Sequence, residues 1–147
     1  MDPDIDAIER AASERVVEDE AEPISDRAVL HVNAPSRGVF GAVAYRLPLR
    51  AGDAMRITRL AAQYRGAELS QVSVGDAAIA CAMAYLHVVI EGDVPEAWRC
   101  PKSGRFDPRL VDLDVLLAMR EAVLEHEVRF RDSHTVTATV EVAPLVA

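Results

Sequence analysis

The feature that most constrains the fold is a change of hydrophobic period near residue 50, from two residues to three or four. Side chains alternate along the stretches AVLHVNA (28–34) and GVFGAVAYRL (38–47), as in strands with one buried face. In the second stretch, one face carries Val39, Val43, Tyr45 and Leu47. Because Pro35 and Gly38 supply turn residues between the two stretches, we expect an antiparallel β-hairpin.

After this hairpin, three segments have the spacing of helices, and we expect them over 53–64, 73–90 and 107–131. Asp53 is the expected N-cap of the first, and Ser73 opens a capping box before the second. The third begins with Asp107 as N-cap and a proline at its first position. Its predicted apolar face comprises Leu113, Leu116, Leu117, Val123 and Leu124.

These elements predict an α+β fold, with a mainly helical domain and a small antiparallel β-hairpin or sheet. The single core domain is expected over 27–131, followed by a C-terminal tail over 132–147. The tail holds HTVTATVEV (134–142), whose alternating threonine and valine favour a strand. Three alternatives stay open for this segment: it completes the sheet, it stays unpaired, or it pairs with an exposed edge of another chain.

Charge is distributed unevenly along the chain. Residues 1–22 hold nine acidic and two basic side chains, a net charge of −7 out of a total of −8. An apolar stripe at helical spacing runs through this segment and comprises Ile5, Ile8, Ala12 and Val16. We therefore predict an acidic N-terminal helical arm, which either docks on another surface through the stripe or stays a solvated terminus.

A basic band opposes this arm in charge and comprises Arg46, Arg50, Arg56, Arg59 and Arg65. The band is small, the chain is acidic, and no nucleic-acid-binding motif is present, so a nucleic acid is a poorly matched partner. An acidic protein surface fits better, and the arm of a neighbouring copy would make the chain a homo-oligomer. The arginines, together with Ile5, Ile8 and Val16, are the candidate partner-binding residues.

The stretch WRCPKSGRFDP (98–108) concentrates reactive and charged side chains between the second and third helices. Its prolines and Ser103-Gly104 predict a non-helical loop, which Trp98 and Phe106 attach to the core. The order of glycines in a phosphate-binding loop is missing. The basic residues of this stretch and its border, which would suit an acidic partner, are Arg99, Lys102, Arg105 and Arg109.

No residue pattern points to catalysis, a cofactor or a metal ion. Cys81 lies in an apolar run and is expected to be a small buried side chain, while Cys100 has no His nearby in sequence to act as its base. The side chains of Glu125-His126-Glu127 diverge by about 100° per residue on a helix, which predicts a solvated charged face. We therefore expect a protein that is not an enzyme and binds no cofactor.

The N-terminal sequence and the hydropathy predict a cytoplasmic protein without a membrane partner. MDPDIDAIER lacks the basic and apolar regions of a secretory signal. The longest apolar run, 76–90, is shorter than the roughly 18 residues that a membrane span needs.

The order of several segments resembles that of small tail-assembly chaperones of long-tailed bacteriophages. These segments are YRLPL (45–49), the helix from Asp53, AYL (84–86), PEAW (95–98) and the acid-rich closing helix. The resemblance covers about 38–131 and leaves out the acidic arm and the Thr/Val tail. It implies multivalent binding to the tape-measure protein during tail assembly, and it carries over no catalytic residue.

Together, these patterns lead to the hypothesis of a non-enzymatic protein–protein interaction module in the assembly of a particle, such as a bacteriophage tail. One alternative is a virion structural subunit, such as a connector, tail or decoration protein, that reaches neighbouring copies with the arm and the C-terminal strand. Another is a small enzyme or ligand-binding domain whose pocket the sequence does not reveal. A viral protein of this kind would lie in the host cytoplasm or in the virion.

Overall fold

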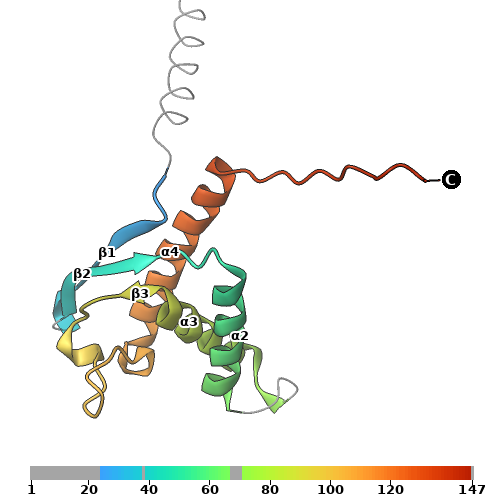
Figure 1. Ribbon diagram of the computed structural model, residues 1–147. Coiled ribbons are helices and arrows are strands. Elements are labelled where there is room, and N and C mark those ends of the chain that lie inside the picture. Colours follow the sequence, from blue (N-terminus) through green and yellow to red (C-terminus); the bar gives the residue numbers. More distant parts are fainter. Residues whose placement is uncertain (1–23, 38, 67–70, 147) are drawn as a thin grey trace, which may run out of the picture. The chain divides into compact units, whose positions relative to one another are not determined.

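The predicted hairpin forms the edge of a small sheet (Figure 1). In the computed structural model, which describes residues 24–37, 39–66 and 71–146, β1 (Arg27–Ala34) pairs antiparallel with β2 (Val39–Arg46). A 3₁₀ turn over Pro35–Arg37 follows β1. The apolar face of β2 and the residue after it is buried, as the alternation predicts, and its members are Val39, Val43, Tyr45 and Leu47.

The third strand is β3 (Ile90–Glu91), which directly follows helix α3 (Val74–Val89). Ile90 lies opposite Tyr45, so the sheet has the order β1-β2-β3. The backbone N–H of Ile90 also donates to the carbonyl of Leu86 and closes the last turn of α3. The helix and the strand therefore meet without a loop. Because β3 is the third strand and residues 135–146 form none, the alternative that the C-terminal segment completes this sheet is wrong.

Three α-helices complete the described α+β fold, and two of them pack against each other. α2 (Ala51–Arg65) lies along α3, while α4 (Leu113–Ser133) ends the helical part of the chain. Gly66 ends α2 with a φ of 70°, in the left-handed region that glycine adopts without strain. Ser73 caps α3 by accepting a hydrogen bond from the Asp76 backbone N–H at 3.1 Å, which confirms the expected start of this helix.

Two helix starts differ from the prediction. Asp53 is not the N-cap of α2 but its third residue, because Ala51 and Gly52 already belong to the helix. Its carboxylate accepts from the backbone N–H of the actual N-cap, Arg50, at 3.2 Å. Asp107 and the proline after it begin a separate 3₁₀ turn, Pro108–Leu110, and α4 starts only at Leu113.

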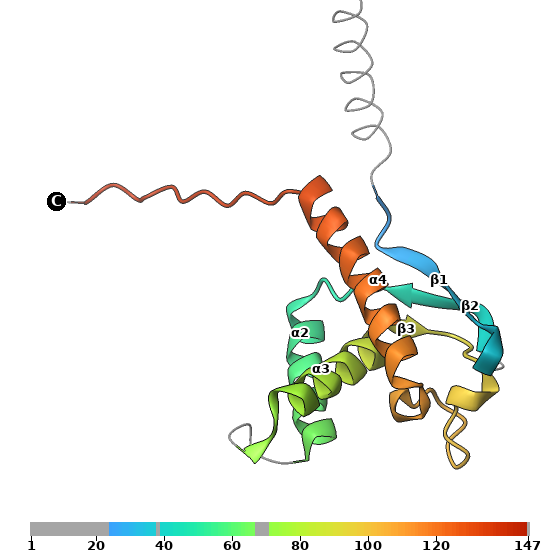
Figure 2. The ribbon, with the colours of Figure 1, turned by 180° about the vertical axis from the view of Figure 1, so that it is seen from behind.

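The described part of α4 up to Val128 crosses one face of the sheet (Figures 1 and 2). It belongs to a compact unit over Ser25–Val128. Its predicted apolar face is only partly correct, because Leu113 and Leu117 are 52% and 41% exposed. The largest fully buried side chains of the core are Trp98, Leu47, Leu86, Leu116, Val43, Val89, Val123 and Pro108.

His126 contradicts the prediction of a solvated face around Glu125-His126-Glu127, because it is only 6% exposed. Its Nε2 lies 2.8 Å from the carbonyl oxygen of Ser25, which only accepts, so in a neutral ring Nε2 carries the hydrogen. Nδ1 then accepts from the Tyr45 hydroxyl at 2.8 Å. The histidine thus joins α4 to β2 and to Ser25, two residues before β1.

Cys81 is exposed on α3, so its expected burial is also wrong. The long apolar run of α3 alternates small and large residues, and the side chains buried from it include Ala80, Ala82, Ala84, Tyr85 and Leu86. Apolar composition therefore does not mark the inner face of this helix. Among the described residues, no helix combines the length and the apolarity that crossing a bilayer requires.

An ion pair between Arg46 and Asp53 fastens the end of β2 to the first turn of α2. The guanidinium donates to both carboxylate oxygens, at 3.1 and 3.2 Å, and the two side chains are 24% and 14% exposed. The hydrogen bonds from Arg46 hold the pKa of Asp53 below its ordinary value. A depressed pKa in the folded state contributes stability above the unfolded pKa of about 3.9, and that stability is lost as the pH falls through the folded pKa.

Asp53→Asn is therefore expected to lower the free energy of unfolding by about 1–2 kcal/mol at pH 7. The difference from the unsubstituted chain should be smaller at about pH 3 than at pH 7, because the native carboxyl takes up a proton as the pH falls toward its depressed pKa. Urea unfolding at both pH values measures this, with the exposed Asp93→Asn as control. A difference that is the same at both pH values would contradict the assigned role of the charge.

Candidate functional site

The outer edge of β1 is open. β1 pairs with β2 on one side only, and from Ala28 onward no described residue forms a backbone hydrogen bond to its other side. In an antiparallel strand, every second residue directs its N–H and C=O away from its one neighbour. Such an edge is a template for another strand unless the protein covers it.

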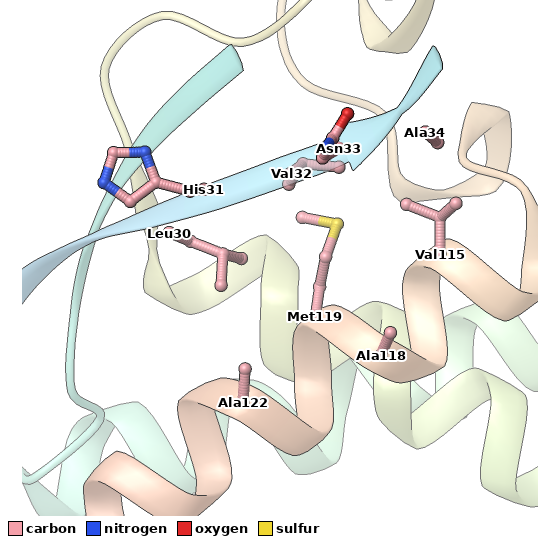
Figure 3. A pocket seen from close by; sticks show the side chains of 9 residues that line it. All are labelled: Leu30, His31, Val32, Asn33, Ala34, Val115, Ala118, Met119 and Ala122. Carbon is pink, nitrogen blue, oxygen red and sulfur yellow. The ribbon is translucent and has the colours of Figure 1, made fainter. Parts of the chain in front are cut away.

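An apolar groove runs beside this edge, between β1 and α4 (Figure 3). It has a volume of about 180 Å³. Figure 3 shows Leu30 pointing from β1 toward α4, and Met119 pointing from α4 toward Val32 of β1. The α4 wall contains two alanines, Ala118 and Ala122, whose small side chains leave the groove unfilled. The other residues that line the groove are His31, Val32, Asn33, Ala34 and Val115.

The C-terminal segment has the complementary pattern. Residues 135–146 form no helix or strand, and all of them are exposed. Along HTVTATVEV, one face of an extended chain would carry valines and an alanine and the other face mainly threonines. Val136, Val140 and Val142 are 91%, 88% and 82% exposed, so nothing within the described residues covers this apolar face.

The predicted arginine band does not form one surface. Arg46 is engaged by Asp53 and by Glu91, whose Oε1 lies 3.5 Å from its Nε. Arg50 precedes α2, and Arg65 is half-buried at its end. Arg56 and Arg59 are exposed along α2. The remaining candidates, Ile5, Ile8 and Val16 of the predicted N-terminal helical arm, lie outside the described residues.

Arg56 instead lines a polar cleft of about 430 Å³ that also contains Arg99 and Arg105. These two arginines come from the loop WRCPKSGRFDP, so the cleft combines a helix with a loop more than 40 positions away in sequence. The sequence shows that this loop is basic, but nothing in the spacing of its basic residues indicates that they meet Arg56. The remaining lining residues are His87, Ile90, Gly92, Asp93, Val94, Gly104 and Phe106.

Trp98 and the residues after it form a tight loop. Trp98 is 2% exposed and lies edge-on to Phe106, with ring centroids 6.3 Å apart, which confirms that both aromatics attach the loop to the core. The backbone N–H of Cys100 donates to the Arg105 carbonyl at 2.8 Å. Gly104 turns the chain with a φ of 69°, as its position in the sequence predicts.

Cys100 is the one cysteine in this loop. Hydrogen bonds from the backbone of Ser103 and Lys102 lower the pKa of its thiol. The described residues place no histidine among its hydrogen-bond partners, and they bring no group of three His, Cys, Asp or Glu side chains together for a metal ion. Comparisons with protein-family models, with curated proteins and with solved structures find no match for this chain.

Proposed function

We propose that this protein is a non-enzymatic assembly module that joins copies of itself by strand addition. The C-terminal segment 134–142 of one copy pairs with the open edge of β1 in the next copy. The observation that carries the proposal is the match between an exposed, extended Thr/Val segment and an unpaired strand edge beside an apolar groove. Main-chain hydrogen bonds supply affinity in such a contact, and alternate side chains supply specificity.

Length and side-chain period support this pairing. β1 has eight residues and HTVTATVEV has nine, so both span roughly 26–30 Å at about 3.3 Å per residue. The groove side of β1 presents Leu30 and Val32 at a spacing of two, which equals the spacing of Val140 and Val142. Docked beside β1, the valines would cover the groove and the threonines would face solvent.

The contact between the C-terminal segment and the β1 edge determines what kind of assembly the copies form. Each copy offers one segment and one edge, so the contact is head-to-tail and produces a ring or an open filament. Repeated units are what a particle-assembly factor with many binding sites requires. Together with the resemblance to tail-assembly chaperones, this supports a role in the assembly of a bacteriophage tail, with the tape-measure protein as partner.

A permanent virion subunit is the second candidate, because head-to-tail strand addition suits a tail or connector ring equally well. The presence of the protein in purified particles separates the two roles. An assembly factor should be absent from the particles, whereas a structural subunit should be present in them at fixed stoichiometry.

The proposal predicts that the full chain forms concentration-dependent multimers and that deletion of residues 134–147 makes it monomeric. Sedimentation velocity measures both states. Val136→Asp/Val140→Asp should act like the deletion, because it places charge on the face that covers the groove. Thr135→Asp/Thr137→Asp is the matched control, with the same charge change on the opposite face.

A groove variant tests the other half of the contact. Ala118→Leu/Ala122→Leu fills the α4 wall at two exposed helix positions, and Ala62→Leu/Ala78→Leu is the control at exposed alanines elsewhere. The groove variant and the tail-deleted chain should each be monomeric alone and form a 1:1 dimer when mixed. A full chain that is monomeric at every concentration, with the amides of 134–142 protected from exchange, would show that the segment closes on its own copy and would refute the proposal.

A further inference from the structure

We infer that the polar cleft lined by Arg56, Arg99 and Arg105 binds a carboxylate-rich peptide, and that its occupant is the acidic segment 1–22 of this chain. This binding site is separate from the edge of β1 and does not depend on the C-terminal contact. The inference rests on three arginines from separate parts of the chain that line one cleft of about 430 Å³.

Three separate parts of the chain build the cleft. Arg56 projects from α2, Arg99 follows the 3₁₀ turn Glu96–Trp98, and Arg105 comes from the far side of the loop. Two glycines, Gly92 and Gly104, lie in its wall with φ values of 77° and 69°. Without side chains, they leave the wall of the cleft open beside the backbone. The apolar lining consists of Ile90, Val94 and Phe106.

The three arginines are available to an external anion. Ion pairs within the described residues engage Arg37, Arg46 and Arg109, but none engages the three arginines of the cleft. The Nε of Arg99 donates to the Val94 carbonyl at 3.0 Å, which orients this guanidinium and leaves its two terminal nitrogens for a ligand. Guanidinium groups bind carboxylates with paired, charge-assisted hydrogen bonds.

Other titratable groups at the cleft leave its charge positive. Asp93 is the one carboxylate that lines it. Burial, reinforced by the charge of Arg56, lowers the pKa of His87, so this ring is neutral near pH 7. Its Nδ1 lies 2.8 Å from the Tyr64 hydroxyl. Three arginines against one aspartate thus give a net positive site, which is uncommon for a chain with a total charge of −8.

The chain itself supplies the matching ligand chemistry. Its excess negative charge lies almost entirely in residues 1–22, which hold nine acidic side chains, while the rest of the chain has a net charge of −1. A cleft of this volume has room for two or three carboxylate side chains rather than for the whole segment. We therefore place acidic side chains of this segment in the cleft.

The test measures binding of a fluorescent peptide of residues 1–22 by anisotropy at low and high salt. The receptor is a full chain in which the nine acidic residues of 1–22 are replaced by Asn or Gln, here called the neutral-arm chain. Peptide should bind this chain and bind the unsubstituted chain more weakly, because the native segment competes for the cleft. Absence of binding to the neutral-arm chain would overturn the inference.

Two charge-matched variants of the neutral-arm chain locate the contact. Arg56→Gln/Arg99→Gln/Arg105→Gln should weaken peptide binding by about tenfold or more, since several surface ion pairs are lost together. Arg59→Gln/Lys102→Gln/Arg129→Gln removes the same charge outside the cleft and should weaken binding by less than about threefold. Circular dichroism confirms that both are folded. Equal weakening in both variants would show a diffuse electrostatic attraction and refute the site.

Inorganic phosphate tests whether the cleft binds phosphate instead of carboxylates, since arginines bind both anions. Millimolar phosphate should compete no better than sodium chloride of equal ionic strength if the cleft selects a peptide. Saturable phosphate binding that the cleft variant abolishes, combined with unchanged peptide binding, would assign the cleft to a phosphate ligand and overturn the proposed occupant.

Discussion

Trp98→Ala is expected to lower the free energy of unfolding by about 3–5 kcal/mol, the loss usual for truncating a fully buried aromatic side chain. Trp98 is 2% exposed, and its ring contacts Phe106 across the loop. The backbone carbonyl of Trp98 also accepts from the Asp107 backbone N–H at 2.8 Å, so the two ends of the loop meet at Trp98. The buried indole therefore fixes this point to the core. The cavity left by alanine would therefore loosen the loop as well as the core.

Chemical unfolding followed by circular dichroism measures this effect, because the variant has no other tryptophan to report by fluorescence. Trp98→Phe should lower the free energy of unfolding by about half as much as Trp98→Ala, since the smaller ring still fills part of the space. Leu110→Ala, at a side chain that is 44% exposed, serves as control and should change stability by less than about 1 kcal/mol. An unchanged midpoint for Trp98→Ala would mean that the indole contributes little to the core.

His126→Ala is expected to lower the free energy of unfolding by about 2–4 kcal/mol. The substitution removes a buried ring and two hydrogen bonds of 2.8 Å, one to Tyr45 and one to Ser25. Tyr45 is itself only 6% exposed, so its hydroxyl loses this partner where water has little access. Breaking a buried hydrogen bond by removal of one partner costs about 1–3 kcal/mol, to which the lost packing is added.

A double-mutant cycle with Tyr45→Phe separates the hydrogen bond from the packing. Tyr45→Phe alone should lower stability by about 1–2 kcal/mol, and the two substitutions together by less than the sum of the single effects. His134→Ala is the control for removal of an imidazole from the same helix region, since that ring stacks on Phe130 without a core position. Full additivity in the cycle would show that Tyr45 and His126 do not interact energetically.

The hairpin and the start of α3 were predictable because local residue patterns dictate them. Alternation identified β1 and β2, and Ser73 identified the start of α3. A local pattern of this kind needs several residues. β3 has only two, and what makes Ile90 a strand residue is its position opposite Tyr45, which depends on the packing of α3.

Tertiary packing also explains the predictions that failed. His126 looked like part of a solvated charged face, yet Tyr45 and Ser25 supply the two partners that make its burial tolerable. Cys81 looked buried because its neighbours are apolar, although α3 directs it to solvent. The arginine cleft needs Arg56 to meet residues far along the chain, and no spacing rule relates them.

The direct junction between α3 and β3 governs how the domain opens. Ile90 closes the last helical turn with its N–H and lies beside β2 as a strand residue, so no flexible segment separates the helix from the sheet. A fluctuation that detaches β3 must also release the end of α3. In native-state hydrogen exchange, the amides of Ile90 and of the preceding turn should therefore share one opening free energy with the end of β2 and behave as a single cooperative unit.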